Sequence, residues 1–180
     1  MGYNVRVSKL KQIYRWLSIV GPSCLIVALG CYLLPLFTTF TPYGERIDFY
    51  GFWLIFGGQR DFVLPSGVYS FTARLSLYLL IVSQCLLLGA AGGYLSRHSA
   101  FNARFSALLA IGAVVGISMT RFLLSFTMSV PQDGFFFGYG FYLALCFAAL
   151  GLAIMILANV FQILVNRSKK SEKPNEKTSF

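Results

Sequence analysis

The chain has 180 residues, of which 57% are hydrophobic and 12% are charged, and its formal net charge is +9. A soluble domain carries about 25% charged residues, so this composition excludes an ordinary water-soluble globular protein and indicates a surface that faces lipid. The basic residues lie at the two ends and in one short loop beside apolar segments, without a basic face on which bases would stack, which excludes nucleic-acid binding. We therefore predict an integral membrane protein with the lipid bilayer as its first partner.

Four apolar segments are long enough to cross a bilayer, because about 20 helical residues cover a hydrocarbon core of ~30 Å. We predict an all-α membrane protein whose domain of residues 17–165 is a four-transmembrane-helix bundle, with spans at 17–37, 75–95, 105–127 and 139–165. A lead of residues 1–16 precedes this domain, and a polar, lysine-rich tail of residues 166–180 is expected to be disordered.

The first span is partly similar to a signal peptide, since "ALGC" at 28–31 has the cysteine of a lipoprotein cleavage site. However, Ala28 and Leu29 stand in the reverse of the usual order, and the apolar run continues to Phe37. We therefore expect an uncleaved first helix. Pro22 and Pro35 are expected to bend this helix near its two ends.

The loop of residues 38–74 is the longest segment between spans. Its stretches "IDFYGFWLIF" and "DFVLP" flank "GGQR", which predicts a small hairpin around a Gly-Gly turn; an interfacial helix is the alternative. Its aromatic residues suit a membrane–water interface or a protein contact: Phe49, Tyr50, Phe52, Trp53 and Phe56.

A long first outer loop, a short inner loop and a short second outer loop are together similar to the tetraspan plan of claudin-like proteins. The similarity is one of topology. "GFW" at 51–53 is only a fragment of the claudin signature, and this loop has no cysteine. No family is assigned on this basis.

Small residues mark the faces on which helices approach closely in lipid. Gly89 and Gly93 end the second span, and Gly112 and Gly116 form a GxxxG pair in the third. These four glycines are the predicted helix-packing positions, either within one bundle or between copies of the chain. The four cysteines lie in apolar runs without metal-ligand spacing, so we expect buried apolar side chains, no metal site and no cofactor.

Arg121 lies within the third span, about 10 Å from its outer end by helix rise. Its helical neighbours Ser118 and Ser125 form a polar stripe that we expect to face the bundle interior. Arg121 has three possible roles: it pins the outer loops through Asp133, Asp61, Asp48 or Glu45; with Arg74 and Gln84 it lines a ligand-binding pocket for an anion; or it snorkels to the interface.

The orientation follows from the basic residues, because cytoplasmic loops carry the excess of Lys and Arg. Eleven of the fifteen lie in the lead, the loop between the second and third spans, and the tail. We therefore predict cytoplasmic termini in a plasma or bacterial inner membrane.

Three classes of function remain to be weighed. No reactive set of an enzyme is recognisable, so we expect no catalysis. Only Arg121 offers an ionisable group inside a span, which makes a small transporter or a lipid- or anion-binding protein the alternative. We expect a non-catalytic accessory, assembly or interaction protein, in a larger membrane complex or a homo-oligomer.

Overall fold

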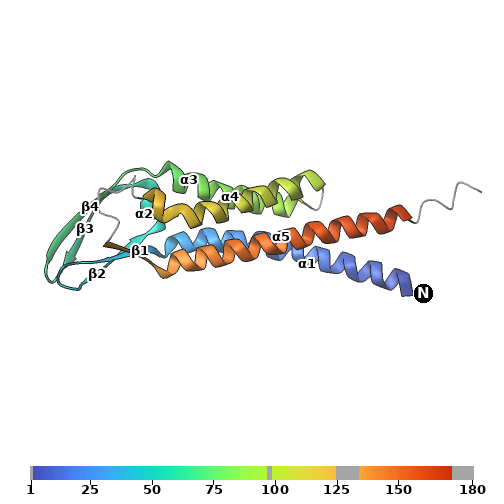
Figure 1. Ribbon diagram of the computed structural model, residues 1–180, viewed down its shortest axis with the longest axis horizontal. Helices are drawn as coiled ribbons and strands as arrows, with labels where there is room; N and C mark the ends of the chain where they lie inside the picture. Colours follow the sequence, from blue (N-terminus) through green and yellow to red (C-terminus); the bar gives the residue numbers. More distant parts are fainter. Residues whose placement is uncertain (1, 97–98, 125–133, 172–180) are drawn as a thin grey trace, which may run out of the picture.

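The computed structural model describes residues 2–96, 99–124 and 134–171, with side chains at all of these except 2–7, 100, 121, 123–124 and 167–171. Four long helices lie side by side in it, and their bounds are α1 Gly2–Gly30, α3 Leu77–Leu95, α4 Ala100–Leu124 and α5 Tyr139–Ser171 (Figure 1). Figure 1 also shows that the N-terminus and the end of α5 lie at one end of the molecule, here called the terminal end. The β-strands lie at the other, here called the strand end.

The prediction of four long apolar helices is confirmed for the described part of the chain. The segments with the length and hydropathy to cross a membrane are Ser8–Leu33, Leu77–Leu95, Phe101–Thr120 and Tyr139–Asn166. They indicate a membrane-embedded protein. The α5 helix continues to Ser171, so its helical backbone extends beyond residue 165, where the tail was predicted to begin.

The predicted bounds of the first helix, 17–37, are wrong at both ends. The α1 helix begins at Gly2, and after Gly30 a single 3₁₀ turn, η1 Cys31–Leu33, ends the helical backbone. The residue before a proline is forced out of the helical region, and Leu34 before Pro35 is accordingly extended, with φ −96° and ψ 162°. Pro35 therefore starts a strand instead of bending a helix.

The strand end contains two small antiparallel sheets, whereas the sequence predicted one small hairpin in the 38–74 loop, with an interfacial helix as the alternative. One has the strand order β2-β1-β5, from β1 Pro35–Phe40, β2 Arg46–Tyr50 and β5 Phe135–Phe137. The other pairs β3 Gly58–Leu64 with β4 Gly67–Ala73. Pairing of β1 with β5 joins two segments that lie almost a hundred residues apart in the sequence.

The predicted Gly-Gly hairpin turn is wrong. The residues "GFWLIF" form a short helix, α2 Gly51–Phe56, and Gly57 ends it with a positive φ of 73° and an N–H that donates to the Trp53 carbonyl at 2.8 Å. This is the glycine-terminated helix end that an L side chain rarely adopts. Gly57 and Gly58 thus connect α2 to β3, and the tight turn that reverses the chain lies at residues 65–66.

An aromatic core at the strand end holds the two sheets together. Phe49 of β2 has no exposed surface, and its ring lies 5.1–5.7 Å from four other rings, namely Trp53, Phe62, Phe71 and Phe135. Aromatic pairs in this range stabilise by about 0.5–1.5 kcal/mol beyond their buried area. Both sheets, α2 and β5 are therefore packed around one side chain.

Helix packing depends on close approach between α1 and α5 and between α3 and α4, which lie together in pairs in Figure 1. At the α1–α5 crossing, a Cβ atom on Gly151 would lie only 3.0 Å from the Gly21 carbonyl oxygen, so the two backbones are nearly in contact. Three small residues spaced four apart on one stripe of α5 are buried, namely Gly140, Ala144 and Ala148. Toward the terminal end, α1 and α5 diverge (Figure 1).

Candidate functional site

The structure describes the side chains of two of the three residues in the predicted ligand-binding pocket, Arg74 and Gln84. Arg121 lies in the helical backbone of α4, but its side chain lies outside the described residues. Arg74 is exposed, two residues before Ser76, whose hydroxyl caps α3 by accepting the Leu79 N–H at 3.3 Å. Gln84 is exposed seven residues into α3, roughly 10 Å from its start. A shared site of these three residues therefore remains a prediction.

The polar stripe beside Arg121 does not face the bundle interior at Ser118. This side chain is exposed, and its hydroxyl donates to the Val114 carbonyl one turn earlier, at 2.9 Å. Such a bond satisfies a hydroxyl without any neighbouring helix, so Ser118 can face lipid. Ser125, the other member of the stripe, lies outside the described residues.

Asp48, one of the predicted counter-ions of Arg121, is bound within its own sheet. Its carboxylate accepts from the Arg46 guanidinium and from the Thr38 hydroxyl, each at 2.8 Å. The hydrogen bond and the charge of Asp48 raise the pKa of Arg46. The pair is exposed at the surface, so it contributes little to stability.

Two further predicted counter-ions have hydroxyl partners in the hairpins. Asp61 accepts from Ser70 at 2.6 Å across the β3–β4 pair. Glu45 accepts from Ser66, which ties the connection before β2 to the turn between β3 and β4. Asp133 lies outside the described residues.

The GxxxG pair of α4 is asymmetric in its surroundings. A Cβ on Gly116 would lie 2.5 Å from Cγ2 of Val82, and the Gly116 carbonyl accepts from the Tyr78 hydroxyl, so this glycine lies at the contact between α3 and α4. Gly112 is exposed, and a Cβ there would have only the Cys85 sulfur nearby, at 3.9 Å.

The two glycines of α3 lie against α1. A Cβ on Gly93 would lie 2.5 Å from Cγ of Pro22, and one on Gly89 would lie 3.3 Å from the Leu25 side chain. Pro22 is therefore accommodated by a glycine on the facing helix. The glycines at 89, 93 and 116 all lie where helices meet.

A groove on the side of the molecule, here called the lateral groove, lies between α1, α2 and α3 near the strand end. Its first part, here called the apolar part, has a volume of about 410 Å³. Apolar residues line most of it, and Ser83 and Gln84 supply its polar side-chain groups; the lining is Ile26, Leu29, Gly30, Tyr32, Leu33, Phe52, Ile55, Phe56, Leu80, Ser83 and Gln84. Gln84 was predicted from sequence, whereas the rest of this groove was not.

A second hollow of about 470 Å³ continues the lateral groove toward the strands. The two parts share Leu33, Phe52 and Phe56, and the second adds Trp53. It also adds Arg60, whose guanidinium carbon lies 5.6 Å from the centres of two aromatic rings, those of Tyr50 and Phe62. Cation–π attraction of this kind fixes a guanidinium against the rings.

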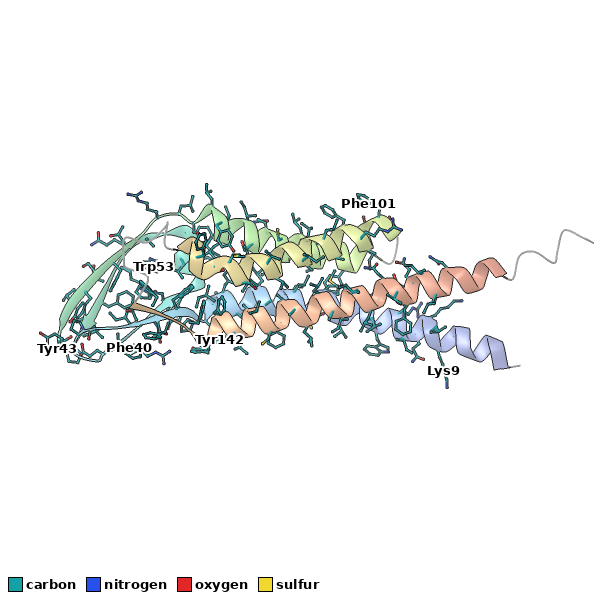
Figure 2. All side chains as sticks on the ribbon, in the orientation of Figure 1. Lys9, Phe40, Tyr43, Trp53, Phe101 and Tyr142 are labelled. Atoms are coloured by element: carbon teal, nitrogen blue, oxygen red, sulfur yellow. The ribbon has the colours of Figure 1, made fainter. Side chains whose placement is uncertain are left out.

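A second surface feature is an exposed aromatic patch of Phe40, Tyr43 and Phe136. The rings of Phe40 and Phe136 lie 5.9 Å apart, edge to face, on the side of the three-stranded sheet turned away from Phe49. Phe40 is 52% exposed, Phe136 57% and Tyr43 75%. Figure 2 shows Tyr43 at the tip of the strand end and Phe40 between that tip and the four long helices.

The diverging helices form a polar cleft at the terminal end, with a volume of about 820 Å³. Lys11 and Arg15 of α1 and Gln162 and Asn166 of α5 line it. Lys9, labelled in Figure 2, lies on the same part of α1. The cleft is the basic region of the described structure.

The prediction that all four cysteines are buried is wrong for Cys146. Cys24 and Cys31 are buried and Cys85 is partly so, but Cys146 is exposed on α5. Among the described residues, no three His, Cys, Asp or Glu side chains are grouped closely enough to hold a metal ion.

Comparison of the chain with protein-family models, with curated proteins and with solved structures gave no match in any of the three.

Proposed function

We propose that this chain is a non-catalytic multi-pass membrane protein that binds a second membrane protein through its strand end. The aromatic patch of Phe40, Tyr43 and Phe136 is the observation that supports this function. Aromatic side chains are enriched among the residues that contribute most to protein interfaces. A patch on the aromatic-cored strand end, outside the four long helices, suits a protein partner better than lipid.

The proposed orientation places both termini in the cytoplasm of a plasma or bacterial inner membrane. The described basic residues Lys9, Lys11 and Arg15 belong to the lead, and Arg104 lies near the start of α4, on the side where the sequence has eleven of its fifteen Lys and Arg residues. Basic residues stay on the cytoplasmic side during insertion. The strand end then faces the opposite compartment, where it can meet the external domain of a partner.

The partner is tested by co-purification. The chain, tagged after its tail, is extracted gently from native membranes, and a membrane protein in fixed stoichiometry is expected. The double variant F40T/F136T should lose that protein, since threonine suits a strand but removes the aromatic surface. Recovery of the chain alone, or only with further copies of itself, would overturn the proposal.

The matched control is V63T/V68T. These valines pair across β3 and β4 and are 80% and 65% exposed, so they offer an apolar surface of the same kind on the other sheet. Their replacement should leave the partner bound. Loss of the partner in both double variants would indicate general disturbance of the strand end.

Orientation is tested separately with two cysteine variants. V63C at the strand end should react with a membrane-impermeant maleimide in intact cells, and K9C should react only after the cells are opened. The reverse pattern would overturn the orientation without touching the partner proposal.

A further inference from the structure

We infer that the lateral groove is a binding site for one anionic glycerophospholipid, with an acyl chain in its apolar part and the phosphate at Arg60. This inference goes beyond the proposed function: it needs a membrane-embedded chain but no protein partner. Three features of the groove support it.

The first feature is the apolar part, which has the surface that an acyl chain requires. It lies along the strand-end halves of α1 and α3, within segments apolar enough to cross a membrane. Ile26, Leu33, Phe52 and Phe56 in its walls are 47–67% exposed, so the groove is open at the surface of the helices. A volume of about 410 Å³ lies within the range of ligand sites in proteins.

The second feature is the continuous path from this part to a positive charge. The rings of Phe52 and Phe56 lie 4.7 Å apart, on the side of α2 opposite to its buried Leu54, and border both hollows. Beyond them the second hollow contains Arg60. An amphiphile with a hydrocarbon chain and a charged end matches this order of surfaces.

The third feature is the sign of that charge. Arg60 stacks on aromatic rings, where a guanidinium stays charged and can still present N–H donors to phosphate. The neighbouring carboxylates on the two strands have partners of their own and do not line the second hollow: Asp61, next to Arg60 in β3, accepts from the Ser70 hydroxyl, and Asp48 of β2 is bound to Arg46. The second hollow therefore favours an anion over a zwitterion.

Polar groups inside the apolar part distinguish a glycerophospholipid from hydrocarbon alone. The Gln84 amide and the Ser83 hydroxyl line the groove, and Ser83 also donates to the Leu80 carbonyl at 2.7 Å. An amide facing lipid is costly without a partner. The ester carbonyls of a phospholipid can accept from Gln84, whereas an alkyl chain cannot.

The apolar part can be tested directly with a tryptophan placed in its wall at Ile26, which lines this part and not the second hollow. Tryptophan fluorescence is quenched when a brominated acyl chain lies against the ring. In the variant W16F/W53F/I26W, whose sequence keeps a single tryptophan at residue 26, quenching is compared in vesicles that contain either brominated phosphatidylglycerol or brominated phosphatidylcholine. We expect phosphatidylglycerol to compete about fivefold better for the site, close to the gain of one basic residue near an anionic surface.

Two variants and one control separate the parts of the inference. R60Q should abolish the preference, so that the two lipids quench equally, and R104Q should leave it unchanged, because Arg104 is exposed on α4 and does not line the groove. G30L should weaken quenching by both lipids, since Gly30 lines the groove and a Cβ there would meet none of the described residues within 4 Å. Equal quenching by the two lipids before mutation, or equal effects of R60Q and R104Q, would overturn the site.

Discussion

Gly138 connects β5 to α5 at a point where the chain has no room for a side chain. A Cβ on this residue would lie 2.3 Å from the Pro35 carbonyl oxygen and 2.9 Å from its carbon, which are backbone atoms that cannot rotate away. The Gly138 N–H also donates to the Leu36 carbonyl at 2.8 Å. We predict that G138A separates the end of β5 from the start of β1.

The size of the effect follows from these contacts. Ordinary contact needs 3.4 Å or more, so the two backbones must move apart by about 1 Å, which strains the hydrogen bond to Leu36. Overpacking lowers the free energy of unfolding by about 1–3 kcal/mol, and loss of one hydrogen bond lowers it by about 1 kcal/mol. Alanine restricts the unfolded chain more than glycine does, which restores about 0.5 kcal/mol. The net loss of roughly 2–3 kcal/mol corresponds to a fall in Tm of roughly 5–10 °C.

Thermal unfolding in detergent, followed by Trp53 fluorescence in the W16F background, measures this change where it occurs, because Trp53 stacks on Phe49 in the strand-end core. The control is G134A in the same segment, where the one atom of the described residues that a Cβ would meet within 4 Å is Oγ1 of Thr39, at 3.7 Å. Its Tm should stay within about 1 °C of the parent. Equal midpoints for G138A and G134A would refute the argument from backbone contact.

Three further predictions test the helix contacts, the aromatic core and the lipid-facing surface. G116A should lower Tm by several degrees, because the added methyl group overlaps Val82 of α3, and G112A should leave Tm unchanged. If both variants lower Tm and both abolish a dimer seen by gel filtration, GxxxG joins two copies of the chain instead. F49A should cost about 3–5 kcal/mol by emptying the strand-end core, whereas F136A, at an exposed position, should cost less than about 1 kcal/mol in the same denaturation experiment. Cys146 should resist a water-soluble maleimide in intact membranes although its side chain is exposed, because it faces hydrocarbon; fast labelling there would contradict a membrane-embedded α5.

The long helices could be predicted because hydropathy and length suffice for them. The α3 span was expected at 75–95 and is found at Leu77–Leu95, and the small shift follows from the Ser76 cap. At the end of α1 an apolar run continued into "PLF", and hydrophobicity alone does not separate a buried strand from a helix there. Pro35 was the available signal, because it forces the residue before it out of the helix.

The sheet and the groove could not be predicted from local patterns. Pairing of Phe37 with Phe137 depends on which loops the helices bring together, and no period in either segment records it. The groove likewise combines three separate helices. Arg60 of β3 joins it by lying over the ring of Tyr50, which belongs to β2. The spacing of Phe52 and Phe56 was a signal for one apolar helical face that the hairpin interpretation passed over.

The central position of β1 has a consequence for the order in which this protein can be made. One edge of β1 is covered by β2, which follows it closely in the chain, but the other edge is covered by β5, which leaves the ribosome only after α3 and α4. During synthesis the first three long helices can enter the membrane while that edge of β1 is still unpaired, and an open edge is a site for wrong pairing. Translation of the segment around β5 then closes the strand end, so truncation before residue 135 should yield a chain that inserts but aggregates at that edge.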